Sequence, residues 1–304
     1  MSQVSMQVEI GALHMKNPVT VGSGTFAAGR EYSAFIDVAA LGAVTTKGVS
    51  LNGWPGNDGT RIAETPSGML NSIGLQNPGV DHLIEEDLPW LQSQGATVIV
   101  NVAGHSVDEY ARVIERLEDA PLDAYEVNIS CPNVDGGGMS FGSDPKLAAE
   151  VISACRKRTE RPLIAKLTPN VTDIALIAQS VQDAGADAVS LINTVCGMAI
   201  DAYTRRSILA RGIGGLSGPA IKPIALGMVW QCHKAIDIPI IGMGGIRTGI
   251  DAVEFMLAGA RAVAVGTANF IDPRATMQVI EGIERYCIEQ GVGDVNELVG
   301  ALQW

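Results

Sequence analysis

The chain has 304 residues, 47% of them hydrophobic and 5% aromatic, and carries a formal net charge of -12 at pH 7. This apolar content suffices for a large buried core, while the acidity argues against nucleic acid or an anionic membrane surface as the main partner. No stretch approaches the ~20 apolar residues of a membrane span, so we expect a soluble protein with one domain, residues 1–304.

The cysteine and histidine positions indicate neither a metal site nor a secreted protein. Five cysteines are scattered without a Cys-x-x-Cys pair, which fits neither a zinc site nor an iron–sulfur cluster. None of the four histidines stands at the end of an expected strand, so no metal is expected. An odd number of cysteines, with no basic N-terminal segment leading into an apolar run, indicates a reducing cytoplasm.

Short apolar runs alternate with helical patterns along the chain. Residues 1–18 are expected to form a hairpin or arm. Eight apolar runs follow, and each ends at a polar residue or a glycine. They cover residues 19–22, 43–46, 97–100, 125–129, 163–165, 188–192, 240–241 and 262–265.

Helical patterns separate most of these runs. They are expected near residues 32–40, 80–94, 110–117, 145–158, 173–184, 219–235, 249–257 and 273–290. Asp173 is expected to cap one of these helices. Two long loops are expected at 48–78 and 195–218, and the first is too long to be a passive connector.

Eight strand–helix units at roughly 30-residue spacing predict an α/β fold, a (β/α)8 TIM barrel with an N-terminal hairpin and long βα-loop insertions. A doubly wound open sheet is the alternative architecture. It would normally carry a Gly-x-Gly-x-x-Gly turn after its first strand, and residues 21–28 contain none. The barrel is therefore favoured.

Polar residues and glycines occupy the ends of the expected strands, where barrel enzymes gather their chemistry. These are Ser23, Lys47, Asn101, Asn128, Lys166, Asn193, Gly244-Gly245 and Gly266-Thr267. The glycines at the ends of the last two strands, with the helix from Ile250 after the first pair, predict a phosphate site. The alternative is that these glycines only allow tight turns between strand and helix. A lysine such as Lys166 could stabilise the negative charge that a flavin ring gains on accepting a hydride.

Apolar and polar residues alternate in the stretch 124–133, with Glu126 and Asn128 between apolar neighbours, which is typical of a strand. A cysteine, Cys131, follows this alternating part. Pro132 bars a regular strand from continuing. A thiolate can remove a proton next to a carbonyl, so Cys131 is a candidate general base. The alternative is a buried cysteine with a structural role.

Eight motifs resemble the class 1 dihydroorotate dehydrogenases, in family order over nearly the whole chain. They are TTKG at 45–48, NSIGLQNPG at 71–79, NISCPN at 128–133, KLTPN at 166–170, NT at 193–194, GGLSG at 214–218, GMGGI at 242–246 and VGTA at 265–268. The resemblance implies a barrel that binds one FMN and oxidises (S)-dihydroorotate to orotate in pyrimidine (UMP) biosynthesis.

The resemblance also implies residue roles. Cys131 would take the C5 proton of dihydroorotate while the C6 hydride passes to flavin N5. FMN contacts would be Ser23, Lys47, Gly48, Asn101, Asn128, Lys166, Ile192, Gly218, Gly244, Gly245, Gly266 and Thr267. Substrate contacts would be Lys47, Asn71, Ser72, Ile73, Gly74, Leu75, Asn128, Asn133, Asn193 and Thr194.

Within the family, the cysteine base looks like the class 1 enzymes. The stretches NSIGLQNPG and ISCPNVDGGGMSFG look like the B-type, which reduces NAD+ through a partner. The partner would carry FAD and a 2Fe–2S cluster, in a heterotetramer of two catalytic and two electron-transfer chains. This chain has neither a dinucleotide fingerprint nor cluster-binding cysteines, which agrees with placing FAD and the cluster on the partner. Open alternatives are a dihydropyrimidine dehydrogenase-like FMN subunit, a fumarate-linked A-type homodimer, a phosphosugar isomerase or lyase, and a non-catalytic scaffold subunit.

Overall fold

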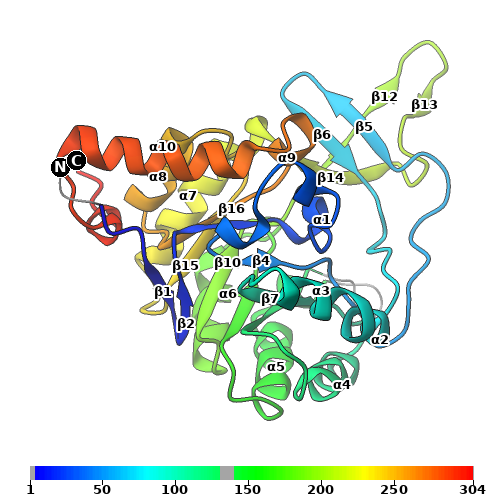
Figure 1. Cartoon of the computed structure of the whole chain (residues 1–304). Helices are drawn as coiled ribbons and strands as arrows, with labels where there is room; N and C mark the ends of the chain where they lie inside the picture. The colour runs from blue at the N-terminus through cyan, green and yellow to red at the C-terminus, as the bar shows by residue number, and fades with distance from the viewer. Residues whose placement is uncertain (1–3, 131–139, 304) are drawn as a thin grey trace.

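The computed structural model describes residues 4–130 and 140–303, and its centre is a parallel eight-stranded sheet in the order β3-β16-β15-β10-β9-β8-β7-β4. Helices alternate with these strands and surround them, which confirms the predicted (β/α)8 barrel (Figure 1). The strands are β3 (Val19–Val21), β4 (Val44–Thr45), β7 (Val98–Val102), β8 (Ala124–Asn128), β9 (Leu163–Lys166), β10 (Ala188–Leu191), β15 (Ile240–Met243) and β16 (Ala262–Val265).

The barrel closes between its first two strands, β3 and β4. Gly42 N donates a hydrogen bond to Val19 O at 2.9 Å, and the hydroxyls of Thr20 and Thr45 lie 3.0 Å apart inside the barrel. A Cβ at Gly42 would overlap the carbonyl oxygen of Asn17, so only glycine allows the chain to pass this close.

The helices follow the sequence pattern closely. They are α2 (Val80–His82), α3 (Leu88–Ser93), α4 (Val107–Leu117), α5 (Pro145–Arg156), α6 (Ile174–Asp183), α7 (Lys222–His233), α8 (Gly249–Leu257) and α10 (Ala275–Gln290). A π-helical turn, η3 (Leu83–Asp87), joins α2 to α3, so 80–94 is one helical segment as expected. Asp173 caps α6 by accepting a hydrogen bond from Leu176 N at 3.1 Å, which confirms its predicted role.

Several short elements were not expected. Residues 32–40 form two 3-10 turns, η1 (Tyr32–Ala34) and η2 (Val38–Ala40), in place of one helix. The Asp37 side chain accepts from Ala39 N at 3.0 Å and so starts a new turn within the segment. The short helices outside the expected ones are α1 (Ser23–Phe26), η4 (Phe141–Ser143), α9 (Ala268–Ile271) and η6 (Val295–Leu298). A further turn, η5 (Pro219–Ile221), leads into α7 and begins where the helix at 219–235 was expected.

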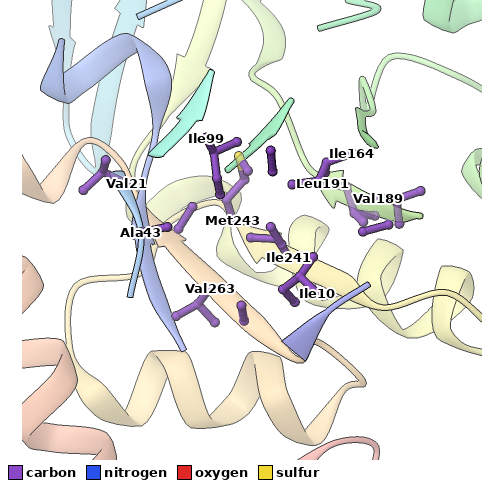
Figure 2. Close-up of a cluster of buried hydrophobic side chains, with 14 of the residues drawn as sticks. Ile10, Val21, Ala43, Ile99, Ile164, Val189, Leu191, Ile241, Met243 and Val263 are labelled. Atoms are coloured by element: carbon purple, nitrogen blue, oxygen red, sulfur yellow. The ribbon is translucent and has the colours of Figure 1, made fainter. Parts of the chain in front are cut away.

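The expected N-terminal hairpin is present as β1 (Val8–Ile10) and β2 (Leu13–Met15). A Cβ at its turn residue Gly11 would lie 3.0 Å from the Cβ of Asp187, which immediately precedes β10, so the hairpin lies against the amino-terminal end of the barrel. Figure 2 shows Ile10 of this hairpin beside Ile241 and Val263 of the barrel strands, all of them buried. The apolar core therefore continues from the barrel interior into the hairpin.

The two long insertions carry more regular structure than the sequence predicts. β5 (Ile62–Thr65) and β6 (Gly68–Asn71) come from the insertion after β4, and β11 (Val195–Met198) and β14 (Ile213–Ser217) from the insertion after β10. They form one antiparallel sheet in the order β11-β14-β6-β5, which we call the roof sheet. A small hairpin, β12 (Ile200–Asp201) and β13 (Arg206–Ser207), extends beyond it (Figure 1).

Among residues 4–130 and 140–303, none of the helices combines the length and apolar character needed to cross a bilayer.

Candidate active site

A cavity of about 1020 Å³ lies at the carboxyl end of the barrel strands, beside the roof sheet. Its walls come from the segments that follow all eight barrel strands, β3, β4, β7, β8, β9, β10, β15 and β16, and from β6 and β14 of the roof sheet. This is the edge where barrel enzymes place their chemistry, and the volume is at the upper end of the range for ligand pockets.

The cavity brings together nearly all the predicted site residues that the structure describes. From the predicted FMN set it is lined by Ser23, Lys47, Gly48, Asn128, Lys166, Ile192, Gly218, Gly244, Gly245, Gly266 and Thr267. From the predicted substrate set it is also lined by Asn71, Ser72, Ile73, Gly74, Leu75, Asn193 and Thr194. Asn101 is fully buried and lies behind this lining, whereas Cys131 and Asn133 lie outside the described residues.

Glycines form one wall of the cavity, at the ends of β15 and β16. Gly244 and Gly245 have φ values of 128° and 81°, which residues with a side chain rarely adopt. A Cβ at Gly245 would lie 2.9 Å from Gly218 O, while a Cβ at Gly266 would meet no heavy atom within 4 Å. The wall at Gly266 therefore opens onto free space bounded by backbone, a surface suited to an anion such as a phosphate.

One detail of the predicted phosphate site is wrong. The start of α8, at Gly249 and Ile250, lines a different cavity of about 490 Å³ against α10. The Thr248 side chain caps this helix, and the Asp251 carboxylate accepts from the backbone N–H of Arg247 and of Thr248. The short helix that does begin at the site is α9, directly after Thr267.

The floor of the cavity carries a buried ion pair. Lys166 Nζ lies 3.3 Å from Glu126 Oε1 and 3.4 Å from Ser23 Oγ, and both Lys166 and Glu126 are buried. The Glu126 carboxylate also accepts hydrogen bonds from Asn101 Nδ2 and Ser190 Oγ. Sequence reasoning gave Glu126 no role, although a charged residue inside an otherwise apolar strand of a barrel is a signal for it.

Asparagines dominate the side of the cavity below the roof sheet. Asn193 Nδ2 donates to Asn128 Oδ1 at 3.4 Å, and Thr194 N donates to Asn193 Oδ1 at 2.8 Å. Asn170, which the sequence analysis did not select, also lines the cavity and donates through Nδ2 to Thr194 O at 3.0 Å. Amide side chains supply both donors and acceptors, so this wall can bind a ring with alternating carbonyl and N–H groups.

Three further buried polar atoms lack a partner in the part of the chain that the structure describes, two of them in the cavity lining and the third, on Asn101, behind it. Ser72 Oγ, Asn101 Oδ1 and Ser130 Oγ are buried and have no hydrogen-bond partner among the described residues. Ser72 and Ser130 line the cavity. Because buried polar groups normally have partners, these atoms indicate a polar ligand. Ser130 was missed from the sequence, since a single serine beside a cysteine carries no distinctive pattern.

A stacked aromatic pair stands at the cavity wall. The rings of Trp54 and His105 lie 3.8 Å apart with an interplanar angle of 13°, and both residues line the cavity. As expected, His105 does not stand at a strand end, but it lines the cavity from the segment that follows β7. β7 extends to Val102, two residues beyond the apolar run, which brings His105 close to the strand end.

The barrel and its cavity define the class of the protein: a TIM-barrel enzyme with a glycine-lined wall, a buried lysine and an asparagine-rich wall around one ligand site. The family model described as "Dihydroorotate dehydrogenase" matches residues 5–287. The chain belongs to the dihydroorotate dehydrogenase family and is an oxidoreductase.

Curated relatives match over essentially their whole length. The chain is 56% identical over 302 residues to a protein of Alkaliphilus metalliredigens, covering 99% of this chain and 100% of the relative. It is 55% identical to one of Desulforamulus reducens (98% and 99% covered) and 54% identical to one of Geobacter sulfurreducens (100% of both). All three are named "Dihydroorotate dehydrogenase B (NAD(+)), catalytic subunit".

Proposed function

We propose that the chain is the catalytic subunit of an NAD+-linked dihydroorotate dehydrogenase, which oxidises (S)-dihydroorotate to orotate in de novo pyrimidine biosynthesis. The names of the full-length relatives support this activity. The observation that carries it is one cavity in which a buried lysine, an open glycine wall and an asparagine wall face the same space. These are the groups that a flavin phosphate, a reducible ring and a flat amide-bearing substrate require.

FMN fits this chain's residues. The open space at Gly266 and the positive φ values of Gly244 and Gly245 suit its phosphate, and the Asn101 Oδ1 without a partner suits a donor on the ring. FMN, when bound, supplies the hydride acceptor. The ammonium of Lys166 would stabilise negative charge on the ring, and Ser23, Lys47, Gly48, Asn128, Ile192, Gly218 and Thr267 would complete the contacts.

Dihydroorotate would bind below the roof sheet. Lys47 would neutralise its carboxylate, and the segment 71–75 with Asn128, Asn193 and Thr194 would hold the ring edge. Cys131 would remove the C5 proton and Asn133 would add a further contact; both assignments rest on the sequence. The asparagine amides around the ring would orient it so that the hydride leaves toward the flavin.

A second chain would carry the electrons onward. The words "catalytic subunit" in the names of the relatives support such a partner. We propose that it is an iron–sulfur flavoprotein with FAD and a 2Fe–2S cluster, that two copies of each chain form a heterotetramer, and that the complex works in the cytoplasm.

The proposal is tested by purifying the chain from its native host under mild conditions and recording visible spectra. Expected are flavin bands that bleach anaerobically with dihydroorotate, and a co-purifying chain that restores them with NAD+. Bleaching by dihydrouracil and not by dihydroorotate would indicate the dihydropyrimidine dehydrogenase activity instead. Reoxidation by fumarate without any partner would indicate the A-type, and a colourless protein would contradict the flavin chemistry altogether.

A further inference from the structure

A four-residue polar cluster in the barrel links the candidate site to the strands beneath it. Asn101, Glu126, Lys166 and Ser190 lie on the neighbouring strands β7, β8, β9 and β10, and Glu126 contacts the other three. Exposure is 0% for Asn101, 2% for Glu126, 5% for Lys166 and 0% for Ser190. The cluster is therefore shielded from solvent, where charge interactions are strong.

Glu126 is the centre of this cluster. Its Oε1 accepts from Asn101 Nδ2 and lies 3.3 Å from Lys166 Nζ, and its Oε2 accepts from Ser190 Oγ at 2.7 Å. Burying either charge alone would be costly, so the carboxylate and the ammonium each depend on the other. Any charge that Lys166 presents to the cavity is thus partly offset by Glu126.

Glu126 also sets the geometry of two predicted FMN contacts. The Lys166 ammonium, on a flexible four-carbon stem, is held between Glu126 Oε1 and Ser23 Oγ. Asn101 gives its amide N–H to Glu126, which leaves its Oδ1 beside Gly48, 2.5 Å from where a Cβ of that residue would lie. The carboxylate thereby decides which end of the Asn101 amide is left for a ligand.

We propose that Glu126 is a positioning residue that fixes the Lys166 ammonium and sets the net positive charge at the bound flavin. The inference rests on the proposed function, in which Lys166 faces FMN. A negative carboxylate behind the ammonium lowers the midpoint potential of bound FMN, because reduced flavin carries negative charge. The Ser190 hydroxyl donates to that carboxylate and so weakens its effect.

Two variants with opposite expected signs test the role of Glu126. Glu126→Gln keeps the shape: its Oε1 can still accept from Lys166, and its amide can donate to Ser190 Oγ. The FMN midpoint potential should rise, and reduced FMN should gain about tenfold in affinity relative to oxidised FMN. Ser190→Ala leaves the ion pair in place and removes a donor to the carboxylate, so the potential should fall.

Spectroelectrochemical titration of the FMN-loaded chains gives the three potentials, and fluorescence titration of the apoproteins gives the affinity ratios. A purely structural role would leave the potentials unchanged or shift both variants in one direction, and either result overturns the proposal. If Glu126→Gln does not fold, the sign of the Ser190→Ala shift still decides. If the wild-type chain binds FMN and bleaches with dihydroorotate but the two variants keep its midpoint potential, only the role of Glu126 is refuted. If the wild-type chain binds no FMN, both proposals are refuted.

Discussion

Asn71 on β6 faces Gly215 on β14, and Asn71 Nδ2 donates to Gly215 O at 3.3 Å although 144 residues separate the two. This pairing joins the two long insertions into one sheet beside the cavity. A Cβ at Gly215 would overlap the Thr194 hydroxyl, so β14 can pass this close to Thr194 only because residue 215 is a glycine. The position of Thr194, a predicted substrate contact, therefore depends on the backbone of β14, which in turn pairs with β6 of the other insertion.

Gly215→Ala should displace Thr194 and impair substrate binding. Because the added methyl group meets Thr194 and not the glycine wall at Gly244 and Gly245, FMN content should stay at the wild-type level. We expect kcat/KM for dihydroorotate to fall about 10- to 100-fold, the size of effect that small misplacements cause. Steady-state kinetics on protein quantified by its flavin absorbance measures this.

Gly227→Ala is the matched control. Gly227 lies in α7, and a Cβ there would meet no heavy atom within 4 Å. Alanine favours a helix interior over glycine by about 1 kcal/mol, so this variant should be at least as stable as the wild type and equally active. Wild-type kcat/KM in Gly215→Ala would contradict the proposed contact between the roof sheet and the substrate side.

The barrel could be predicted from the sequence because its signals are local. Each strand is a short apolar run, each helix has its own periodicity, and Asp173 caps α6 through a partner three residues away. The roof sheet as a whole could not be predicted in this way: β6 pairs with β5 and β14 with β11 inside their own insertions, but the sheet is joined by the pairing of β6 with β14 between the insertions. A pairing over such a sequence distance leaves no pattern in either segment alone.

The same difference between local and long-range signals decides which residues of the candidate site could be predicted. Residues at strand ends, such as Lys166 and Gly266, could be selected because a parallel barrel brings all its strand ends to one rim. Glu126 lies two residues before the end of β8, and its importance comes from side chains on three other strands. The places of His105 and Ser130 in the cavity lining likewise become visible only once the cavity is assembled.

Asp251 predicts a pH dependence of stability. Burial raises the pKa of this carboxyl, but hydrogen bonds from Lys222 and from the N–H groups of Arg247 and Thr248 outweigh burial, and the net pKa is lowered. Such a group adds stability that is present above its unfolded pKa of about 3.9 and is lost as the pH falls through the lower folded pKa. Asp251→Asn should therefore lower the free energy of unfolding by about 1 kcal/mol at pH 7, and by less below pH ~4.

Urea unfolding of wild type and variant at a series of pH values measures this difference. Asp108→Asn is a suitable comparison, because Asp108 is exposed and its ion pair with Arg112 is 3.9 Å long. Exposed pairs of this kind contribute little, so that variant should stay close to wild type at every pH. A gap between wild type and Asp251→Asn that does not change with pH would contradict the assignment.

Cys131→Ala should retain FMN and lose most of the turnover. A positioned general base accounts for about 10²–10⁴ in rate, so anaerobic bleaching of the flavin by dihydroorotate should slow by that factor. Cys196→Ala is the control, because Cys196 is an exposed thiol that lines the candidate-site cavity. Stopped-flow traces that slow equally in both variants, or in neither, would remove Cys131 from the role of base.

Lys166→Met should destabilise the apoprotein strongly, because it leaves the Glu126 carboxylate buried beside a methyl group. Removing one partner of a buried ion pair typically costs about 3–5 kcal/mol. The double variant with Glu126→Gln should recover much of this loss, since a neutral amide needs hydrogen bonds but no counter-charge. Urea unfolding of the wild type, both single variants and the double variant gives the coupling energy directly. Single-variant losses that simply add in the double variant would show that the two side chains, 3.3 Å apart, do not stabilise one another.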